Sequence, residues 1–192
     1  MKTLTVAMLL ALIMIVMVGT TGYGEETNVL VAYFSSTGNT HSLAKHAADA
    51  LNATLYEIKP EIPYTSADLN YRNNSSRVSL ERNDSSYRPA ISGAVENMEK
   101  YDIVFLGYPI WWGQAPRIIC TFLDNYDFSG KTIVPFCTSG SSGIGSSAIN
   151  LHELCADSTN WLSGARLPSS ASRNDVVAWI NGLGLDVIVE VN

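Results

Sequence analysis

A run of hydroxyl-bearing residues contains the side chains and the spacing that bind a phosphate group. It reads Ser35-Ser36-Thr37-Gly38-Asn39-Thr40, and it joins an apolar run, residues 29–34, to a segment with apolar residues at helical spacing, residues 41–51. The start of a helix offers unpaired N–H groups and the positive end of the helix dipole, to which hydroxyl groups add further donors. Gly38 allows the backbone to approach a ligand closely. The sequence therefore predicts a pocket that holds a phosphate dianion without any arginine.

Other phosphate-binding motifs fit this stretch poorly. A dinucleotide fingerprint requires three glycines, and a Walker loop requires Gly-Lys followed by Ser or Thr; neither is present between residues 35 and 40. The remaining alternative is an ordinary helix capped by Ser or Thr after a strand.

Two more loops contain unusual residues directly after apolar runs. Pro109-Ile110-Trp111-Trp112-Gly113 follows residues 102–108, and Thr138-Ser139-Gly140-Ser141-Ser142-Gly143 follows residues 131–137. In an open parallel sheet a ligand binds outside the carboxyl ends of the strands. We therefore expect these two loops and residues 35–40 to converge on one edge of a sheet.

The elements that must position these loops alternate between strands and helices. Strands are predicted at 29–34, 54–59, 102–108, 131–137 and 161–167, and helices at 41–51, 118–123, 149–155 and 172–183. This alternation predicts an α/β fold with a parallel sheet and right-handed crossovers. The polar segment 60–98 is predicted to be irregular, with short helices at 66–73 and 75–83. Residues 185–191 form an apolar tail, for which a small extra strand is predicted.

The first loop resembles the phosphate loop of flavodoxins, Ser/Thr-x-Thr-Gly-x-Thr, at every position. The runs 107–116 and 138–145 also resemble those of a bacterial flavodoxin-like family, and the resemblance extends from residue 28 to about 183. It implies a flavodoxin-like, doubly wound, five-stranded parallel sheet with strand order 2-1-3-4-5, and bound FMN. By this resemblance Ser35, Ser36, Thr37, Gly38, Asn39 and Thr40 bind the phosphate, and the isoalloxazine ring is flanked by Pro109, Ile110, Trp111, Trp112, Gly113, Thr138, Ser139, Gly140, Ser141 and Gly143.

The paired tryptophans suit a flat heteroaromatic ligand. An indole can stack on the ring face while loop amides reach its polar edge, so we expect one of Trp111 and Trp112 to stack and the other to pack in the core. In familiar flavodoxins a peptide beside the ring turns over on reduction, and Gly113 is the candidate for that motion here.

The resemblance favours a small electron-transfer protein that uses FMN with a partner protein or a small acceptor. One alternative is an NAD(P)H-dependent quinone or flavin reductase, although the sequence has no distinct dinucleotide motif; another is a binding module that keeps the fold without redox chemistry. No catalytic residue and no metal ligand is predicted. The net charge of −6 and the pI of about 4.9, without a basic cluster, argue against nucleic acid and anionic membranes as partners.

The N-terminal residues 1–22 have the pattern of an export signal. Lys2 precedes an aliphatic run, residues 4–18, and small residues follow it. The run is shorter than the ~20 residues of a usual membrane span, so a cleaved signal peptide is favoured over an uncleaved membrane anchor. We therefore expect an exported protein, periplasmic or extracellular, whose residues 28–192 form the FMN-binding domain.

Three cysteines, Cys120, Cys137 and Cys155, form no metal-binding pattern. One disulfide is conceivable, but all three lie in apolar patterns, which favours three buried free thiols. His41, beside the first loop, is predicted to be a solvated residue of the first helical turn.

Overall fold

A parallel sheet organises the chain. The computed structural model describes residues 27–190. The main sheet contains six strands: β1 (Val29–Tyr33), β2 (Thr54–Glu57), β5 (Ile103–Pro109), β6 (Thr132–Thr138), β7 (Asn160–Trp161) and β8 (Ala165–Arg166). Their order is β2-β1-β5-β6-β7, with β8 also paired to β6, and every pair is parallel. With β7 and β8 taken as one interrupted strand, this order confirms the predicted 2-1-3-4-5 arrangement.

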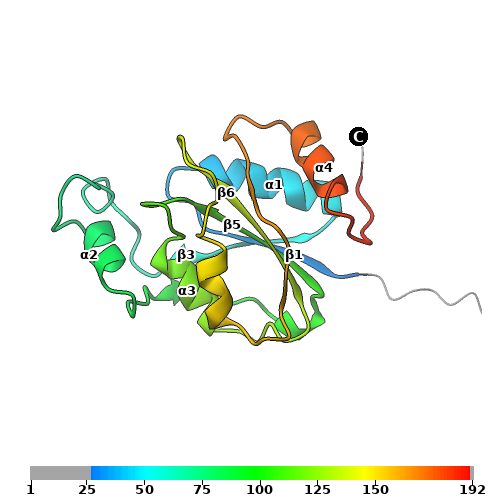
Figure 1. Cartoon of the computed structure of the whole chain (residues 1–192), viewed down its shortest axis with the longest axis horizontal. Coiled ribbons are helices and arrows are strands. Elements are labelled where there is room, and N and C mark those ends of the chain that lie inside the picture. Colours follow the sequence, from blue (N-terminus) through cyan, green and yellow to red (C-terminus); the bar gives the residue numbers. More distant parts are fainter. Residues whose placement is uncertain (1–26, 191–192) are drawn as a thin grey trace, which may run out of the picture.

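Helices cover both faces of the sheet. Helix α1 (Asn39–Leu51) and helix α4 (Arg173–Asn181) lie on one face, whereas α3 (Arg117–Asp124) and the 3-10 helix η2 (Ile149–Leu154) lie on the other (Figure 1). Alternate residues of each strand therefore enter two separate cores. In β1, for example, Leu30 packs on the α3 side and Val31 on the α1 side.

The fifth predicted strand, 161–167, is interrupted between β7 and β8. The carbonyl oxygens of Ile133 and Cys137 in β6 accept hydrogen bonds from the fifth strand. Pro135 lies two residues from each of them, so its backbone groups also face the fifth strand, but proline has no N–H group to donate. The pairing register also shifts by one residue, from Ile133 opposite Trp161 to Phe136 opposite Ala165. The missing donor and the extra residue, a bulge near Gly164, explain the break.

Residues 60–98 form an extension beside the sheet. It contains α2 (Arg77–Asn83), which agrees with the helix predicted at 75–83, and it ends at the first residue of the 3-10 helix η1 (Met98–Lys100). Two short strands, β3 (Lys59–Pro60) and β4 (Ile91–Ser92), pair antiparallel at its base. Figure 1 shows α2 at the end of the molecule farthest from α4.

The helix predicted at 66–73 is wrong, because this stretch consists of turns. The side chain of Asp68 accepts a hydrogen bond from the backbone N–H of Thr65, and Asn70 and Asn73 accept from N–H groups two residues further along the chain. Such side chains compete with helical backbone bonds.

The end of the described chain packs on α1 without forming the extra strand. Residues 185–190 are not in a strand; the N–H of Glu190 donates to the carbonyl of Ala50 at 2.7 Å, and residue 191 lies outside the described part. Helix α4 begins with a capping box between Ser172 and Asp175, close to the predicted start of the closing helix.

The predicted export signal, residues 1–22, lies outside the described residues. Within residues 27–190, no helix is both long and apolar enough to span a membrane.

Candidate functional site

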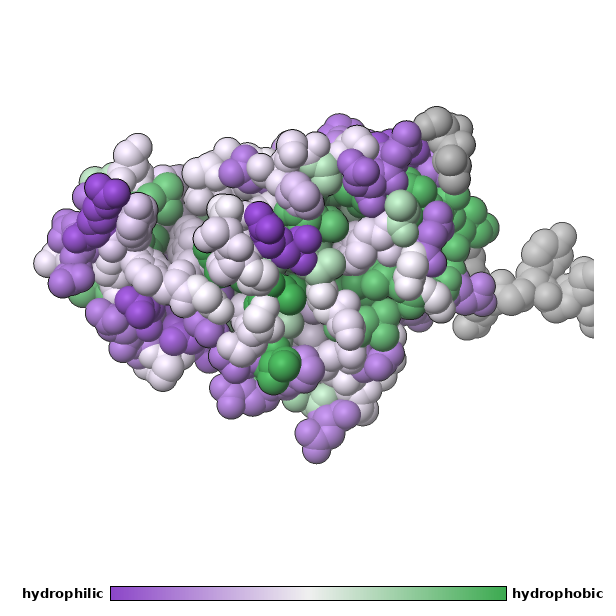
Figure 2. Space-filling view, turned by 45° about the horizontal axis from the view of Figure 1, so that its top comes forward, coloured by the Kyte–Doolittle hydropathy of each residue, from purple (hydrophilic) through white to green (hydrophobic). Residues whose placement is uncertain are grey.

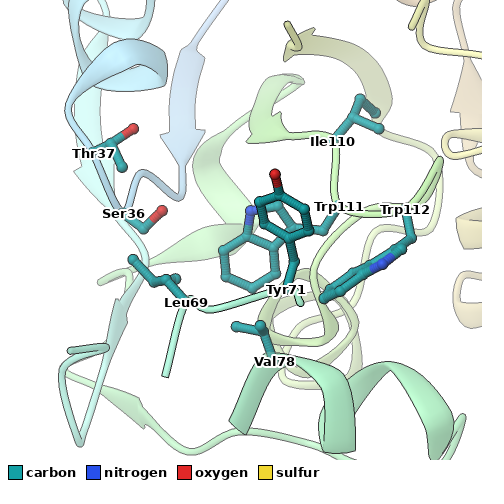
Figure 3. A pocket seen from close by; sticks show the side chains of 8 residues that line it. All are labelled: Ser36, Thr37, Leu69, Tyr71, Val78, Ile110, Trp111 and Trp112. Carbon is teal, nitrogen blue, oxygen red and sulfur yellow. The ribbon is translucent and has the colours of Figure 1, made fainter. Parts of the chain in front are cut away.

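The first predicted loop lies at the carboxyl end of β1 and leads directly into α1. Gly38 occupies the N-cap position with φ of 88°, and no side chain caps the helix there. A left-handed φ of this kind favours glycine, and a Cβ atom at this position would meet no atom within 4 Å. Ser36 and Thr37 lie before the helix start (Figure 3). The first-turn amides of α1 and these hydroxyl groups therefore form a set of donors suited to an anion.

Thr40 has a different position from the other hydroxyl residues of the loop. Its side chain is buried, and its Oγ1 lies 2.9 Å from Oγ1 of Thr138 at the end of β6. The first and third predicted loops therefore meet through these two hydroxyl groups, and Thr37 is the exposed threonine of the phosphate loop.

The second predicted loop contains a tight turn from Trp111 to Gln114. Each of these two residues donates its N–H to the carbonyl of the other, at 2.9 and 3.0 Å. The central residues Trp112 and Gly113 both have positive φ, 48° and 77°, as a type I′ turn requires. Glycine adopts this conformation readily, but a tryptophan adopts it at a cost of about 1 to 2 kcal/mol. The turn therefore fixes the direction of the Trp112 indole at the cost of a strained backbone at this residue.

Trp111 packs towards the core on the α3 side of the sheet. Its ring meets the rings of Phe34 and Tyr64 edge to face, each at a centroid distance of 5.5 Å. Tyr64 in turn donates its hydroxyl to the carboxylate of Glu81 at 2.8 Å, while Arg77 pairs with the other oxygen of that carboxylate at 2.7 Å. Burial and the Glu81 charge raise the pKa of Tyr64, which keeps it a neutral donor. Trp111 therefore packs against core rings, but it also lines the cavity described below, so which tryptophan stacks on a ligand stays a prediction.

Trp112 points towards the extension of residues 60–98. Its ring centroid lies 6.5 Å from that of Tyr71, with the planes at 78° to each other, and the guanidinium of Arg82 lies 5.1 Å from its centroid. Both partners come from the extension, so the second loop and this extension share an aromatic surface.

A cavity of about 310 Å³ lies between these elements. Its lining comes from the first loop, the second loop and the extension: Ser36, Thr37, Ile110, Trp111, Trp112, Leu69, Tyr71 and Val78. Figure 3 shows these side chains around the hollow, with Ser36 and Thr37 on one side and Trp112 on the other. The structure thus brings Ser36 and Thr37 of the first predicted loop and both tryptophans to one cavity.

The third predicted loop lies apart from this cavity. Among the described residues that line the cavity, none comes from 139–143. The Ser139 hydroxyl accepts from the N–H of Ser142 at 3.1 Å, and Arg166 donates to the carbonyl of Ser139 at 3.2 and 3.0 Å. Cβ atoms placed on Gly140 and Gly143 would meet no atom within 4 Å, so the loop leaves open space around both glycines. The ring position between the second and third loops stays a prediction.

Four residues of the extension that the motifs did not single out belong to the site region. Leu69, Tyr71 and Val78 line the cavity, and Arg82 lies over Trp112. The sequence contains only a weak indication of their role, namely an aromatic residue, Tyr71, in a polar segment. In the structure Tyr71 is 62% exposed. Figure 2 shows that hydrophilic residues gather over this end of the molecule, as expected of a surface segment.

His41, in the first turn of α1, is exposed and forms a hydrogen bond with a buried tyrosine. Its Nδ1 lies 2.5 Å from the hydroxyl oxygen of Tyr33. Burial, with a smaller effect of Glu57, raises the pKa of Tyr33 to about 12. The pair therefore supports the start of α1 structurally.

The cysteines are free thiols, in agreement with the favoured interpretation. Cys120 and Cys137 are buried, but Cys155 is only half-buried, because it follows the short η2 at the edge of the core. Burial raises the pKa of Cys137 and of Cys155 to about 11. Within residues 27–190, no group of three His, Cys, Asp or Glu side chains is placed to hold a metal ion.

Comparison with known proteins agrees with this architecture. A family model described as flavodoxin matches residues 28–183. The chain is 45% identical to a Bacteroides eggerthii protein whose structure is described as that of a flavoprotein, with a TM-score of 0.78; the match covers 84% of this chain and all of the other. A similar protein from Bacteroides uniformis is 44% identical, with a TM-score of 0.77 and coverages of 82% and 99%.

A more distant structure shares the fold. It is a flavoprotein from Lactobacillus acidophilus in complex with FMN, 21% identical, with a TM-score of 0.61 and coverages of 83% and 99%. No curated protein matches the chain.

Proposed function

The chain belongs to the flavodoxin family, and on that premise we propose that it binds FMN and transfers electrons through it. One observation carries this proposal: the uncapped start of α1 lies beside an aromatic cavity, and Ser36 and Thr37 belong to both. A phosphorylated ligand with a flat ring matches this combination of an anion site and aromatic surface.

The residues of the first loop fit the phosphate of FMN. Their donors are backbone amides and hydroxyl groups, with no lysine or arginine in the loop. Gly38 leaves room for a close approach, since a Cβ atom there would meet nothing within 4 Å. The exposed Thr37 would donate to the anion, whereas Thr40 orients the loop through its hydrogen bond with Thr138.

The second loop supplies the aromatic contact with the ring. Its turn from Trp111 to Gln114 presents Trp112 to the cavity, and Gly113 follows with a positive φ. When bound, FMN supplies the reversible electron-transfer chemistry. The protein binds and orients it, and the net charge of −6 disfavours additional negative charge on the ring, which favours a low reduction potential.

The absorption spectrum of the purified protein tests this proposal. Flavin bands that remain after gel filtration, with FMN released on denaturation, are expected. Colourless protein that fails to bind added FMN in a titration would refute FMN binding and support the binding-module alternative.

Direct reduction by NADPH distinguishes a carrier from a reductase. The reductase remains the second candidate, because it would use the same bound flavin. Bleaching of the flavin bands by NADPH without any partner would support the reductase; unchanged bands that bleach with dithionite would support the electron carrier.

Export is part of the proposal and depends on the sequence of residues 1–22 alone. Mass spectrometry of the protein recovered from the expressing bacterium tests it. Loss of about the first 22 residues supports a cleaved signal peptide, and an intact N-terminus in the membrane fraction supports the anchor.

A further inference from the structure

Glu81 is a buried carboxylate in the extension of residues 60–98. It lies in α2 and is 2% exposed. Burial of a charged group costs free energy unless the group is paired and hydrogen-bonded. Both of its oxygens have a partner: Oε2 accepts from the Tyr64 hydroxyl at 2.8 Å, and Oε1 accepts from Nε of Arg77 at 2.7 Å. Apolar side chains of similar volume often stabilise a core as well as a buried ion pair does, so stability alone does not account for this network.

The network holds Tyr64 from two sides. Glu81 accepts its hydroxyl hydrogen, and the guanidinium of Arg77 lies 4.0 Å from its ring centroid. The ring of Tyr64 then meets that of Trp111 edge to face at a centroid distance of 5.5 Å, and that of Phe34 at 5.8 Å. Because an edge-to-face contact depends on the angle between the two rings, fixing Tyr64 also fixes the indole of Trp111.

Trp111 is the residue through which this network reaches the cavity. Its side chain lines the cavity, whereas those of Tyr64, Arg77 and Glu81 do not. Val78, one turn before Glu81 in α2, lines the cavity as well (Figure 3). Glu81 therefore lies behind the cavity wall, where it acts on a ligand only through other side chains.

We propose that Glu81 is a positioning residue: through Tyr64 it fixes the indole of Trp111 in the cavity wall, and it thereby determines how well a flat ring packs there. The inference rests on the proposed function in taking that ring to be the flavin's. The orientation of Trp111 itself can be measured without any ligand.

Near-UV circular dichroism of the flavin-free protein tests the first step. The band of Trp111 is the difference between the spectrum of each protein and that of the same protein carrying Trp111→Phe. Glu81→Gln removes the charge at constant volume, and Tyr64→Phe removes the hydroxyl but keeps the ring. The band should weaken in both variants, because an indole without a fixed orientation gives little near-UV signal. An unchanged band in both would overturn the inference.

Titrations with riboflavin and FMN test the second step. Glu81→Gln should weaken both ligands by the same factor, roughly tenfold, because they share the ring and the phosphate loop is untouched. In a protein that already carries Trp111→Phe, the same change should have a much smaller effect, since its action passes through Trp111. Unaltered riboflavin affinity in Glu81→Gln, or strict additivity with Trp111→Phe, would overturn the inference.

A variant without either charge separates positioning from stability. Arg77→Met/Glu81→Leu leaves no unpaired ion, so its free energy of unfolding should recover relative to that of Glu81→Gln. The Trp111 band and the riboflavin affinity should stay low, because nothing holds the Tyr64 hydroxyl. Recovery of both together with the stability would show a merely structural role and overturn the inference.

Asp124→Asn is the matched control. It breaks another ion pair between the extension and α3, with 2.5 Å between Nε of Arg88 and Oδ2 of Asp124, and neither residue lines the cavity. The Trp111 band and the riboflavin affinity should match those of the unmodified protein. Losses equal to those of Glu81→Gln would show that any loosening of the extension is sufficient, and the specific role of Glu81 would be wrong.

Failure of the proposed function gives a different result. If the unmodified protein binds neither FMN nor riboflavin, but the Trp111 band is lost in Glu81→Gln and kept in Asp124→Asn, the positioning of Trp111 by Glu81 stands and the proposed function fails. If FMN binds and the band is the same in Glu81→Gln and Tyr64→Phe as in the unmodified protein, the proposed function stands and this inference is wrong.

Discussion

Thr40 and Thr138 share a buried hydrogen bond, with 2.9 Å between their hydroxyl oxygens, although they lie 98 residues apart in the chain. This contact joins the first turn of α1 to the end of β6. It fixes the phosphate loop relative to the third loop without using any backbone group.

Replacing one of these threonines should destabilise the fold. Thr40→Val keeps the shape but leaves the Thr138 hydroxyl unpaired, so the free energy of unfolding should fall by about 1 to 3 kcal/mol in urea denaturation. Thr40→Val/Thr138→Val should lose less than the sum of the two single changes, since no polar group is left alone. Strict additivity would show that the two hydroxyl groups are not coupled.

Thr37 should affect ligand binding instead of stability. Its side chain is exposed, and Thr37→Ala should weaken FMN binding by about 1 to 3 kcal/mol through loss of a donor to the phosphate dianion. Riboflavin, which lacks the phosphate, should bind the variant and the unmodified protein alike. Thr54→Ala is the control, because Thr54 lies opposite Leu30 at the amino end of β1, whereas Thr37 follows its carboxyl end. Equal losses for FMN and riboflavin would contradict the phosphate assignment.

At position 112, replacement by glycine should leave the protein more stable than replacement by alanine, the reverse of the usual order in a strand or helix. Its φ of 48° favours glycine, so Trp112→Gly should be more stable than Trp112→Ala by about 1 kcal/mol in thermal or urea unfolding. Trp161, in β7 and without a positive φ, is the matched position, where alanine should be the more stable replacement. The same order at both positions would show that the turn is not strained.

Ionisation of Cys137 should lower the free energy of unfolding at alkaline pH. Burial raises the pKa of this thiol to about 11, whereas in the unfolded chain it ionises near pH 9. Ionisation therefore favours the unfolded state: the contribution of Cys137 to stability is complete below about pH 9 and is lost as the pH rises towards 11. Cys137→Ala should flatten the decline of the unfolding free energy over this interval.

Cys155 provides the comparison for that experiment. Its pKa is also raised to about 11, so Cys155→Ala should remove a separate part of the decline, and the double variant should flatten it further. An unchanged slope in Cys137→Ala would mean that this thiol does not titrate with unfolding.

Local patterns were sufficient to predict the sheet and the turn between β1 and α1. The continuous apolar runs at 29–34, 102–108 and 131–137 specify strands buried on both faces, and the crossover rules then leave few possible strand orders. The run from Ser35 to Thr40 specifies the start of a helix by its own residues. These features depend on neighbours in the sequence, so they could be read without the structure.

Contacts between distant segments could not be read in this way. Trp111 and Trp112 are adjacent and identical, yet the turn with two positive φ angles directs one to Phe34 and the other to Tyr71. The break in the fifth strand could be predicted only by knowing that Pro135 lies opposite it. The cavity wall comes from a polar extension that folds through turns stabilised by side chains, without a periodic sequence pattern. In each case the free energy comes from a partner far along the chain, and no local spacing of residues encodes that partner.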